Sequence, residues 1–258
     1  MRQLYFKRSD WILNKSEVDM TRKSVARTSK LNASPQNIIF DKEQSALIVI
    51  DMQNDFCHKS GWLSNIGANI DNLLAIVPNI NAITAICRSN DIPVIWVNWG
   101  NRDDLLNLSP TVLHVYDKYG TGGGLGQKIN ALSDGVLIHG SWGADIHASL
   151  IQSTLDIRVS KFRMSGFWDN ELDSILKNLN VKTLFFTGIN TDQCVFATLM
   201  DASFIGYDCI LVGDACATTS PDYCVDATTY NVQQCYGFVT STKKLCQGLS
   251  EELTDAHF

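Results

Sequence analysis

The sequence lacks long basic runs and long apolar runs. Acidic residues outnumber basic ones by 27 to 21, and the formal net charge is -6. This balance argues against nucleic acid or an anionic membrane surface as the main partner. No stretch approaches the roughly 18 consecutive apolar residues of a membrane helix, and the first fifteen residues hold no apolar segment of signal-peptide type. We therefore expect a cytoplasmic protein with no nucleic-acid partner and no membrane partner.

Signatures of disulfide scaffolds, metal sites and serine hydrolases are also missing. The eight cysteines form no C-x-x-C pair and are far too sparse for a disulfide scaffold. The five histidines show no H-E-x-x-H or comparable ligand spacing, and no G-x-S-x-G elbow occurs. We expect reduced cysteines, no metal site and no cofactor.

Charge is distributed unevenly along the chain. Residues 1–40 hold eight Lys or Arg and three Asp or Glu, so this part is basic while the remainder is acidic. Its acidic residues are unusual for an organelle transit peptide. We therefore divide the chain into a basic N-terminal arm at 1–40, which packs on its own body or on a partner subunit, and one domain at 41–258.

Short apolar runs alternate with segments of helical period. The runs lie at 46–52, 93–99, 156–161, 182–188, 208–215 and 237–242, and the helical segments at 71–90, 169–179, 192–206 and 221–235. Strands that alternate with helices form a parallel sheet covered on both faces. The pattern predicts a single doubly wound α/β domain with a long excursion at 100–155.

Ligands of open α/β sheets bind beyond the carboxyl ends of the strands. Asp51, Asn98 and Lys161 stand at or near such ends, and Cys194 follows another within the turn 188–194. Taken singly, the Asp could form a turn, the Lys could be a solvated edge residue, and the Cys could be a core thiol. Because separate strands bring an acid, a base and a thiol to one edge, we expect a site there.

An acid, an ammonium and a thiol suffice for acyl transfer. Cys194 lies where a turn enters a helix, and we expect the helix N-terminus and Lys161 to lower the pKa of its thiol. Asp51 could accept the thiol proton and return it to a leaving amine. Backbone N–H groups of the turn could stabilise the oxyanion.

Three blocks carry a resemblance to a known family. They are SALIVIDMQNDF with Asp51, VSKFRMSGFWDNELDSIL with Lys161, and LFFTGINTDQCVFATLM with Cys194, and the resemblance spans about residues 39–245. The chain resembles the isochorismatase-like cysteine hydrolases. The resemblance implies a Rossmann-like six-stranded parallel sheet, a homo-oligomer, and attack by Cys194 on an amide carbonyl to form a thioester.

The resemblance also implies details of the site and of the substrate. It implies a cis peptide bond between Ile189 and Asn190, with the N–H groups of Asn190 and Cys194 forming the oxyanion hole. Nicotinamidases of the family carry an Asp-x-His motif after the second strand. This chain reads NWGNRDDL there and has no histidine, which argues against a nicotinamidase. The sequence most resembles those of ureidoacrylate amidohydrolases and then those of biuret hydrolases. This resemblance implies a small ureide, an N-carbamoyl compound or a linear amide as substrate.

Further residues are candidates for contact with this small-molecule substrate. Arg102 could bind a carboxylate, Trp99 could offer a flat face, and the glycine-rich run 120–128 could form a cover over the site. The full set of substrate-binding candidates is Phe56, Asn98, Trp99, Arg102, Trp142, Phe167, Trp168 and Gln234.

Other functions fit the same sequence features. A hydrolase for cyclic amides, similar to streptothricin hydrolase around the nucleophile, would use the same residues. A non-catalytic binding protein would keep the fold and dock a partner through its basic arm. A redox sensor would oxidise Cys194, although the sequence offers no nearby resolving cysteine.

Overall fold

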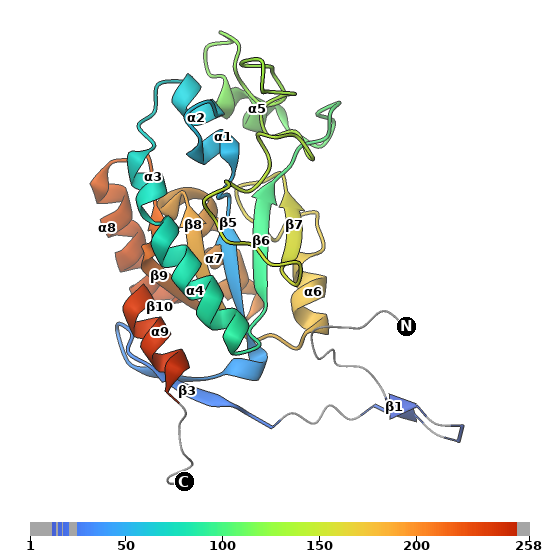
Figure 1. Cartoon of the computed structure of the whole chain (residues 1–258), viewed down its shortest axis with the longest axis vertical. Coiled ribbons are helices and arrows are strands. Elements are labelled where there is room, and N and C mark those ends of the chain that lie inside the picture. Colours follow the sequence, from blue (N-terminus) through green and yellow to red (C-terminus); the bar gives the residue numbers. More distant parts are fainter. Residues whose placement is uncertain (1–11, 14, 17, 21–24, 252–258) are drawn as a thin grey trace.

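Six parallel strands form the central sheet of the protein. The computed structural model describes residues 12–13, 15–16, 18–20 and 25–251. The strand order is β10-β9-β8-β5-β6-β7 (Figure 1), and every neighbouring pair runs parallel. The strands are β5 (Ser45–Ile50), β6 (Val94–Trp99), β7 (Ile157–Lys161), β8 (Thr183–Ile189), β9 (Asp208–Ala217) and β10 (Gly237–Thr240). The prediction of a six-stranded parallel sheet is confirmed.

The apolar runs form strands because they are buried on both faces. All six residues of β5 are buried, and β5 pairs with β8 on one side and with β6 on the other. Strands of this kind carry apolar side chains at consecutive positions instead of alternating with polar ones. The core therefore lies on both sides of β5, and the carboxyl end of β5 lies at the middle of the sheet edge.

Helices cover both faces of the sheet. In Figure 1, α3, α4 and α9 lie in front of the strands, and α6 and α7 lie behind them. None of the helices in the described part of the chain is long and apolar enough to cross a bilayer. The helices are α1 (Asn54–Cys57), α2 (Trp62–Asn65), α3 (Asp71–Ala75), α4 (Val77–Ser89), α5 (Pro110–Tyr116), α6 (Leu172–Asn178), α7 (Phe196–Ile205), α8 (Asp222–Asn231) and α9 (Thr242–Ser250).

The helix predicted over 71–90 is two helices. α3 ends at Ala75, Ile76 stands between, and α4 begins at Val77 with Pro78 in its first turn. Proline has no N–H to donate and clashes with a preceding helical turn, so a helix starts at this point instead of continuing through it. The segments predicted at 192–206 and 221–235 each contain a π-helical turn, at Thr191–Val195 and Val232–Tyr236.

Part of the predicted N-terminal arm belongs to the domain. β3 (Thr28–Leu31) and β4 (Ile38–Asp41) form an antiparallel hairpin, followed by a 3-10 turn at Lys42–Gln44. The hairpin packs on α9 and β10, where Ser34 and Val239 exchange two backbone hydrogen bonds of 2.9 Å. The hairpin, which crosses the predicted boundary at residue 40, thus packs against the domain. Farther upstream, β1 (Ile12–Leu13) pairs with β2 (Val18–Asp19), and residues 1–11 lie outside the described part.

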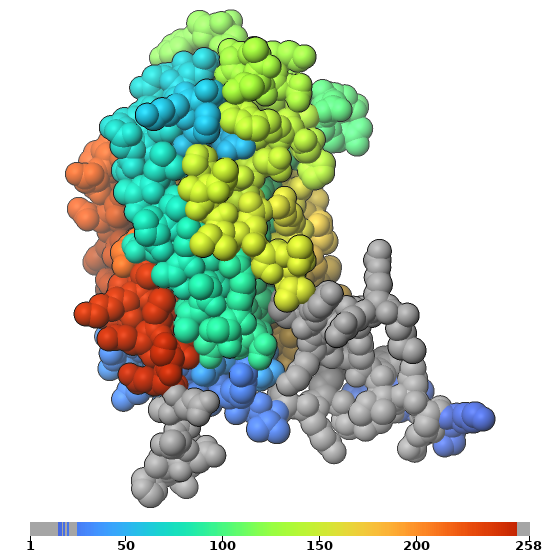
Figure 2. All heavy atoms as spheres, viewed as in Figure 1, coloured from blue at the N-terminus to red at the C-terminus, as the bar shows by residue number. Residues whose placement is uncertain are grey.

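The excursion between β6 and β7 builds a cap and then returns along the domain. α5 lies beyond the carboxyl end of the sheet, beside α1 and α2 (Figure 1). The returning segment, yellow in Figure 2, lies against α4. There the Asn81 side chain bonds Ser149 and Ile151, and Arg88 pairs with Asp156 at 2.7 Å. The excursion is thus anchored to the front helical layer.

Replacing a buried residue of the β3–β4 hairpin should destabilise the whole domain. Leu31 is fully buried, so we expect Leu31→Ala to lower the free energy of unfolding by roughly 2–5 kcal/mol, because it leaves a cavity. Ile39 of the same hairpin is 62% exposed, and Ile39→Ala should change the free energy of unfolding by about 0.5 kcal/mol or less. Urea denaturation followed by circular dichroism measures both, and equal effects would show that the hairpin is not part of the core.

Candidate active site

Three strand ends bring Asp51, Lys161 and Cys194 together. Asp51 follows β5, Lys161 ends β7, and Cys194 lies in the helical turn after β8. The Lys161 Nζ lies 2.8 Å from the Asp51 Oδ2, and both side chains are almost completely buried. The charges of both groups act on the Cys194 thiol, so all three lie close together. The structure therefore brings together the acid, base and thiol predicted from the sequence.

The backbone of β6 and a nearby indole complete the surroundings of this ion pair. The N–H of Trp99 donates to the Asp51 Oδ1 at 3.0 Å, and the Lys161 Nζ donates to the carbonyl of Arg163 at 3.1 Å. The same Nζ lies 4.2 Å from the centre of the Trp99 ring, a cation–π contact. Asp51 has a left-handed backbone with φ of 53°, a conformation that Asp tolerates better than most residues. Groups from β6 and from the segment after β7 thus hold both charges in place.

Burial and charge set the titration of the pair. Burial raises the pKa of the Asp51 carboxyl above its ordinary value, although the charge of Lys161 opposes this shift. Burial alone would lower the pKa of Lys161, but the charge of Asp51 and the hydrogen bonds of the site raise it above its ordinary value. Lys161 is therefore a permanent cation at neutral pH, and Asp51 is a stronger base than an exposed aspartate.

The Cys194 thiol has a raised pKa, not the lowered one predicted from the sequence. Burial is the largest cause, since Cys194 is only 4% exposed, and the Asp51 carboxylate acts in the same direction. Lys161 lowers the pKa as expected but does not outweigh burial. At neutral pH Cys194 is consequently a protonated thiol, and Asp51 is close enough for its charge to act on it.

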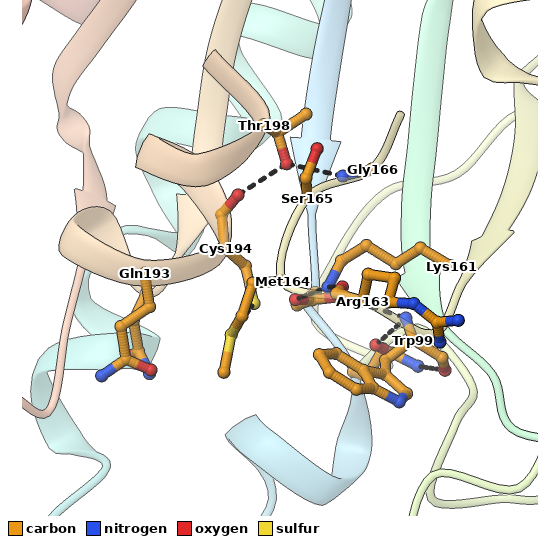
Figure 3. Close-up of polar contacts among 12 residues, drawn as sticks. Trp99, Lys161, Arg163, Met164, Ser165, Gly166, Gln193, Cys194 and Thr198 are labelled. Atoms are coloured by element: carbon orange, nitrogen blue, oxygen red, sulfur yellow. Dashed lines mark hydrogen bonds and ion pairs between the residues drawn. The ribbon is translucent and has the colours of Figure 1, made fainter. Parts of the chain in front are cut away.

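A tight passage of the chain places Cys194 at the sheet edge. Gly188 has φ of 110°, and a Cβ there would lie 2.1 Å from the carbonyl oxygen of Ile50, so the two strands approach closely at this point. The next peptide bond, Ile189–Asn190, is cis, as the family resemblance implies. The helical turn Thr191–Val195 follows and leads into α7. The thiol Sγ lies 3.6 Å from the Met164 Sδ, and Figure 3 shows both beside Lys161 and Trp99.

A cavity of about 190 Å³ opens onto the thiol. Its wall is mainly apolar and aromatic, with polar groups concentrated near Cys194. The residues that line it are Asp51, Phe56, Trp62, Leu63, Val115, Tyr116, Met164, Ile189, Asn190, Gln193, Cys194 and Thr219. Asn190 and Cys194, whose N–H groups were predicted to form the oxyanion hole, therefore both face the cavity. Its size suits a small molecule, since drug-sized ligands occupy roughly 300–1,000 Å³.

Of the predicted substrate-binding residues, Phe56 lines this cavity and three others lie at the surface. Arg102 pairs with Asp104 at 2.6 Å and faces a different, open pocket. The Trp168 indole is 59% exposed and donates to Asp201. Gln234 is exposed in the π-helical turn before β10. The structure thus places these three residues outside the wall of this cavity.

The four other predicted residues are outside the cavity wall for a different reason. Trp99 is 1% exposed and its ring contacts the Lys161 ammonium. Asn98 is its neighbour in β6 and lines none of the cavity. Trp142 packs edge-on against His58, and Phe167 packs against Tyr207. Trp142 and Phe167 thus pack against aromatic residues outside the cavity wall.

Several residues of the site were not predicted from the sequence. Gln53 binds Trp99 twice, accepting from its N–H at 2.8 Å and donating to its carbonyl at 2.7 Å. Gln193 precedes Cys194 and Met164 follows Lys161 by three residues, so their positions in the sequence were a usable signal. Trp62 of α2 and Tyr116 of α5 are distant in the sequence, their rings lie 4.9 Å apart, and no local pattern marks them.

The glycine-rich run 120–128 is tied to the cavity wall. The Trp62 indole donates a hydrogen bond of 2.7 Å to the carbonyl of Gly123. Asp117 accepts from the backbone N–H groups of Thr121 and Gly122. Within the part of the chain that the structure describes, no three His, Cys, Asp or Glu side chains are grouped so that they could hold a metal ion.

Comparison with known proteins gives one family. Residues 45–244 match the family model described as the isochorismatase domain. Ureidoacrylate amidohydrolase RutB of Cronobacter sakazakii is 31% identical over 234 residues, which cover 87% of this chain and 97% of the relative. RutB of Klebsiella variicola is 32% identical over 220 residues, which cover 85% and 93%.

Solved structures share the fold. An isochorismatase family protein from Desulfovibrio vulgaris superposes with a TM-score of 0.65 at 26% identity, covering 81% of this chain and 99% of the other. A cysteine hydrolase from Pseudomonas syringae gives 0.69 at 23% identity, covering 82% and 94%. N-carbamoylsarcosine amidase from Thermoplasma acidophilum gives 0.60 at 24% identity, covering 77% and 96%.

The charges around Cys194 should shift its reactivity in opposite directions. Lys161→Met should move the pH profile of iodoacetamide alkylation to higher pH, because it removes the cation that lowers the thiol pKa. Asp51→Asn should move it to lower pH, because it removes an anion that raises the thiol pKa. Mass spectrometry of the Cys194 peptide measures the rate, with the exposed Cys235 as internal control. Unchanged profiles would show that neither charge acts on the thiol.

Proposed function

The chain belongs to the isochorismatase family, and from that premise we propose that it is a cysteine amidohydrolase. Its substrate is a small ureide, an N-carbamoyl compound or a linear amide, cleaved through a thioester on Cys194. One observation carries the proposal: a buried thiol, a carboxyl and an ammonium gather at the ends of neighbouring strands, beside a cavity of small-molecule size.

Formation of the thioester uses the groups at the three strand ends. The Cys194 Sγ attacks the substrate carbonyl carbon while Asp51 takes the thiol proton. The N–H groups of Asn190 and Cys194 stabilise the oxyanion. Asp51 then gives its proton to the departing nitrogen, the C–N bond breaks, and ammonia or an amine leaves.

Hydrolysis of the thioester reverses the roles. Asp51 takes a proton from water, the hydroxide adds to the thioester carbonyl, and the C–S bond breaks to return the proton to Cys194. Lys161 keeps a positive charge beside both residues throughout and stabilises the carboxylate form of Asp51. Every group used in these steps belongs to this chain, so we propose that the reaction needs no cofactor.

The relatives support the choice of substrate class. Two curated relatives at 31% and 32% identity are named for the hydrolysis of ureidoacrylate. A ureide offers a carbonyl flanked by two nitrogens, and a molecule of this size fits a cavity of about 190 Å³. The family supports the reaction class, and the cavity supports a small substrate.

Removal of the nucleophile should abolish turnover without unfolding the protein. We expect Cys194→Ala to lower kcat/KM by roughly a thousandfold or more. Cys235→Ala is the matched control, because Cys235 is an exposed thiol outside the cavity, and it should retain activity. The measurement is release of ammonia or amine from ureidoacrylate, biuret, N-carbamoyl amino acids, nicotinamide, simple amides and a lactam.

The same panel separates the alternative functions. Cleavage confined to the lactam would replace the proposal with a cyclic-amide hydrolase. Turnover that persists in Cys194→Ala would remove the thioester mechanism. No turnover of any compound by the wild type, with Cys194 still alkylated, would favour a binding protein.

Activity should fall as pH decreases through the pKa of Asp51. Burial raises this pKa above the ordinary value of 3.8, so the acid limb of kcat/KM should lie above pH 3.8. Protonation at lower pH removes the proton acceptor and leaves Lys161 without its counter-ion. A pH series of initial rates measures the limb, and an acid limb at or below 3.8 would contradict the role of Asp51.

A further inference from the structure

The cavity holds no cationic side chain. Among the residues that the structure describes, no Lys, Arg or His lines it, and Asp51 is the one acidic residue in its wall. Lys161 lies behind Asp51, is fully buried, and is already paired with that carboxyl at 2.8 Å. The cavity therefore has no free positive charge with which to bind a carboxylate.

Arg163 and His114 each precede a residue that lines the cavity, but both side chains are directed elsewhere. Arg163 precedes Met164, but its guanidinium bonds the carbonyl of Asn107 at 2.7 Å and the carboxylate of Asp169 at 3.2 Å. His114 precedes Val115 and lines a separate pocket. Arg163 is thus held by its own contacts outside the cavity wall, and His114 belongs to another pocket.

Two side-chain amides form the polar wall beside the thiol. The Asn190 Nδ2 donates to the Gln193 Oε1 at 3.3 Å, and the Asn190 Oδ1 accepts from the backbone N–H of Thr219 at 3.3 Å. The Gln193 Nε2 donates to the Ser220 Oγ at 3.2 Å. A carboxamide has two N–H donors and two acceptor sites, so both groups keep capacity for a ligand. In Figure 3, Gln193 lies on one side of Met164 and Lys161 on the other.

We infer that the substrate is an uncharged ureide, held by the side-chain amides of Asn190 and Gln193. The inference rests on the proposed function and narrows its substrate class. Urea groups present N–H donors and a carbonyl acceptor, which match the two carboxamides in number and kind. Ureidoacrylate, for which the curated relatives are named, carries a carboxylate, so this chain departs from them in specificity.

An anionic ureide meets two obstacles in this cavity. Its carboxylate would lose water among Phe56, Trp62 and Leu63 without gaining a cation, which is unfavourable for a buried charge. It would also approach the carboxylate of Asp51 before the proton transfer that the reaction needs. An uncharged ureide meets neither obstacle.

Hydrolysis of biuret, ureidoacrylate and N-carbamoylglycine by the full-length enzyme tests the inference. Biuret is uncharged, the other two are anions at neutral pH, and all three are ureides of similar size. We expect kcat/KM for biuret to exceed that for either anion by roughly a hundredfold or more, because an unpaired buried charge is strongly disfavoured. Comparable or better cleavage of either anion would overturn the inference while leaving the amidohydrolase proposal intact.

A second readout keeps recognition separate from turnover. Each ligand is tested for protection of Cys194 against iodoacetamide. If no ureide is cleaved, the proposed function fails, yet protection by biuret alone would still support an uncharged ligand. Equal protection by the anions, or no protection by biuret, would overturn the inference in that case.

Substitutions in the wall test which groups recognise the ligand. Gln193→Glu replaces two N–H donors with a carboxylate of nearly the same shape and should raise KM for biuret by about tenfold. Val115 lines the cavity and is 45% exposed, so Val115→Arg can place a guanidinium there, with Val115→Gln as its uncharged control. The Arg variant should narrow the preference for biuret over N-carbamoylglycine by about tenfold relative to the Gln variant. Equal preferences in the two variants would show that charge does not decide selection.

Discussion

The ion pair between Asp51 and Lys161 is the constraint on which the site depends. Its atoms lie 2.8 Å apart and its side chains are 0% and 1% exposed, so neither charge can be solvated by water. Such a pair is stable only where additional polar groups complete it. The N–H of Trp99, the carbonyl of Arg163 and the face of an indole do so here. Because β5, β6 and β7 are neighbours in that order, sheet topology alone brings these groups together.

The sequence predicts the sheet, and the placement of Asp51, Lys161 and Cys194 at its edge, for a common reason. Buried strands carry unbroken apolar runs, and the polar residue that ends each run stands at the active edge, so Asp51 and Lys161 are visible as exceptions to a pattern. The same reasoning fails for the thiol pKa, since burial of Cys194 depends on side chains from distant parts of the chain. It also fails at the β3–β4 hairpin, whose strands of four residues have no apolar run long enough to stand out.

Much of the cavity wall could not be predicted because segments that are distant in the sequence build it. Trp62 and Tyr116 are more than fifty residues apart and meet only after α2 and α5 fold over the sheet edge. From the sequence, Trp142 and Trp168 were equally good candidates for the cavity wall. In the structure, Trp142 packs against His58 and Trp168 bonds Asp201 instead. The fold thus separates two sets of residues: strand ends hold Asp51, Lys161 and Cys194, and the capping segments form part of the cavity wall. A substitution in the cap can therefore reshape the cavity while these three residues stay in place.

The aromatic contacts around Tyr116 have a consequence for observing the enzyme at work. Tyr116 lies 4.9 Å from the ring of Trp62 and 5.3 Å from that of Trp99, and the Trp99 ring faces the Lys161 ammonium. A continuous line of rings therefore connects the cavity wall to the buried charges. Indole emission responds to nearby charge and to displaced water, so arrival of a ligand at Trp62 and a change in charge state beside Trp99 alter the same signal. Two of the six tryptophans of the chain therefore lie where ligand binding and charge changes can act on their emission.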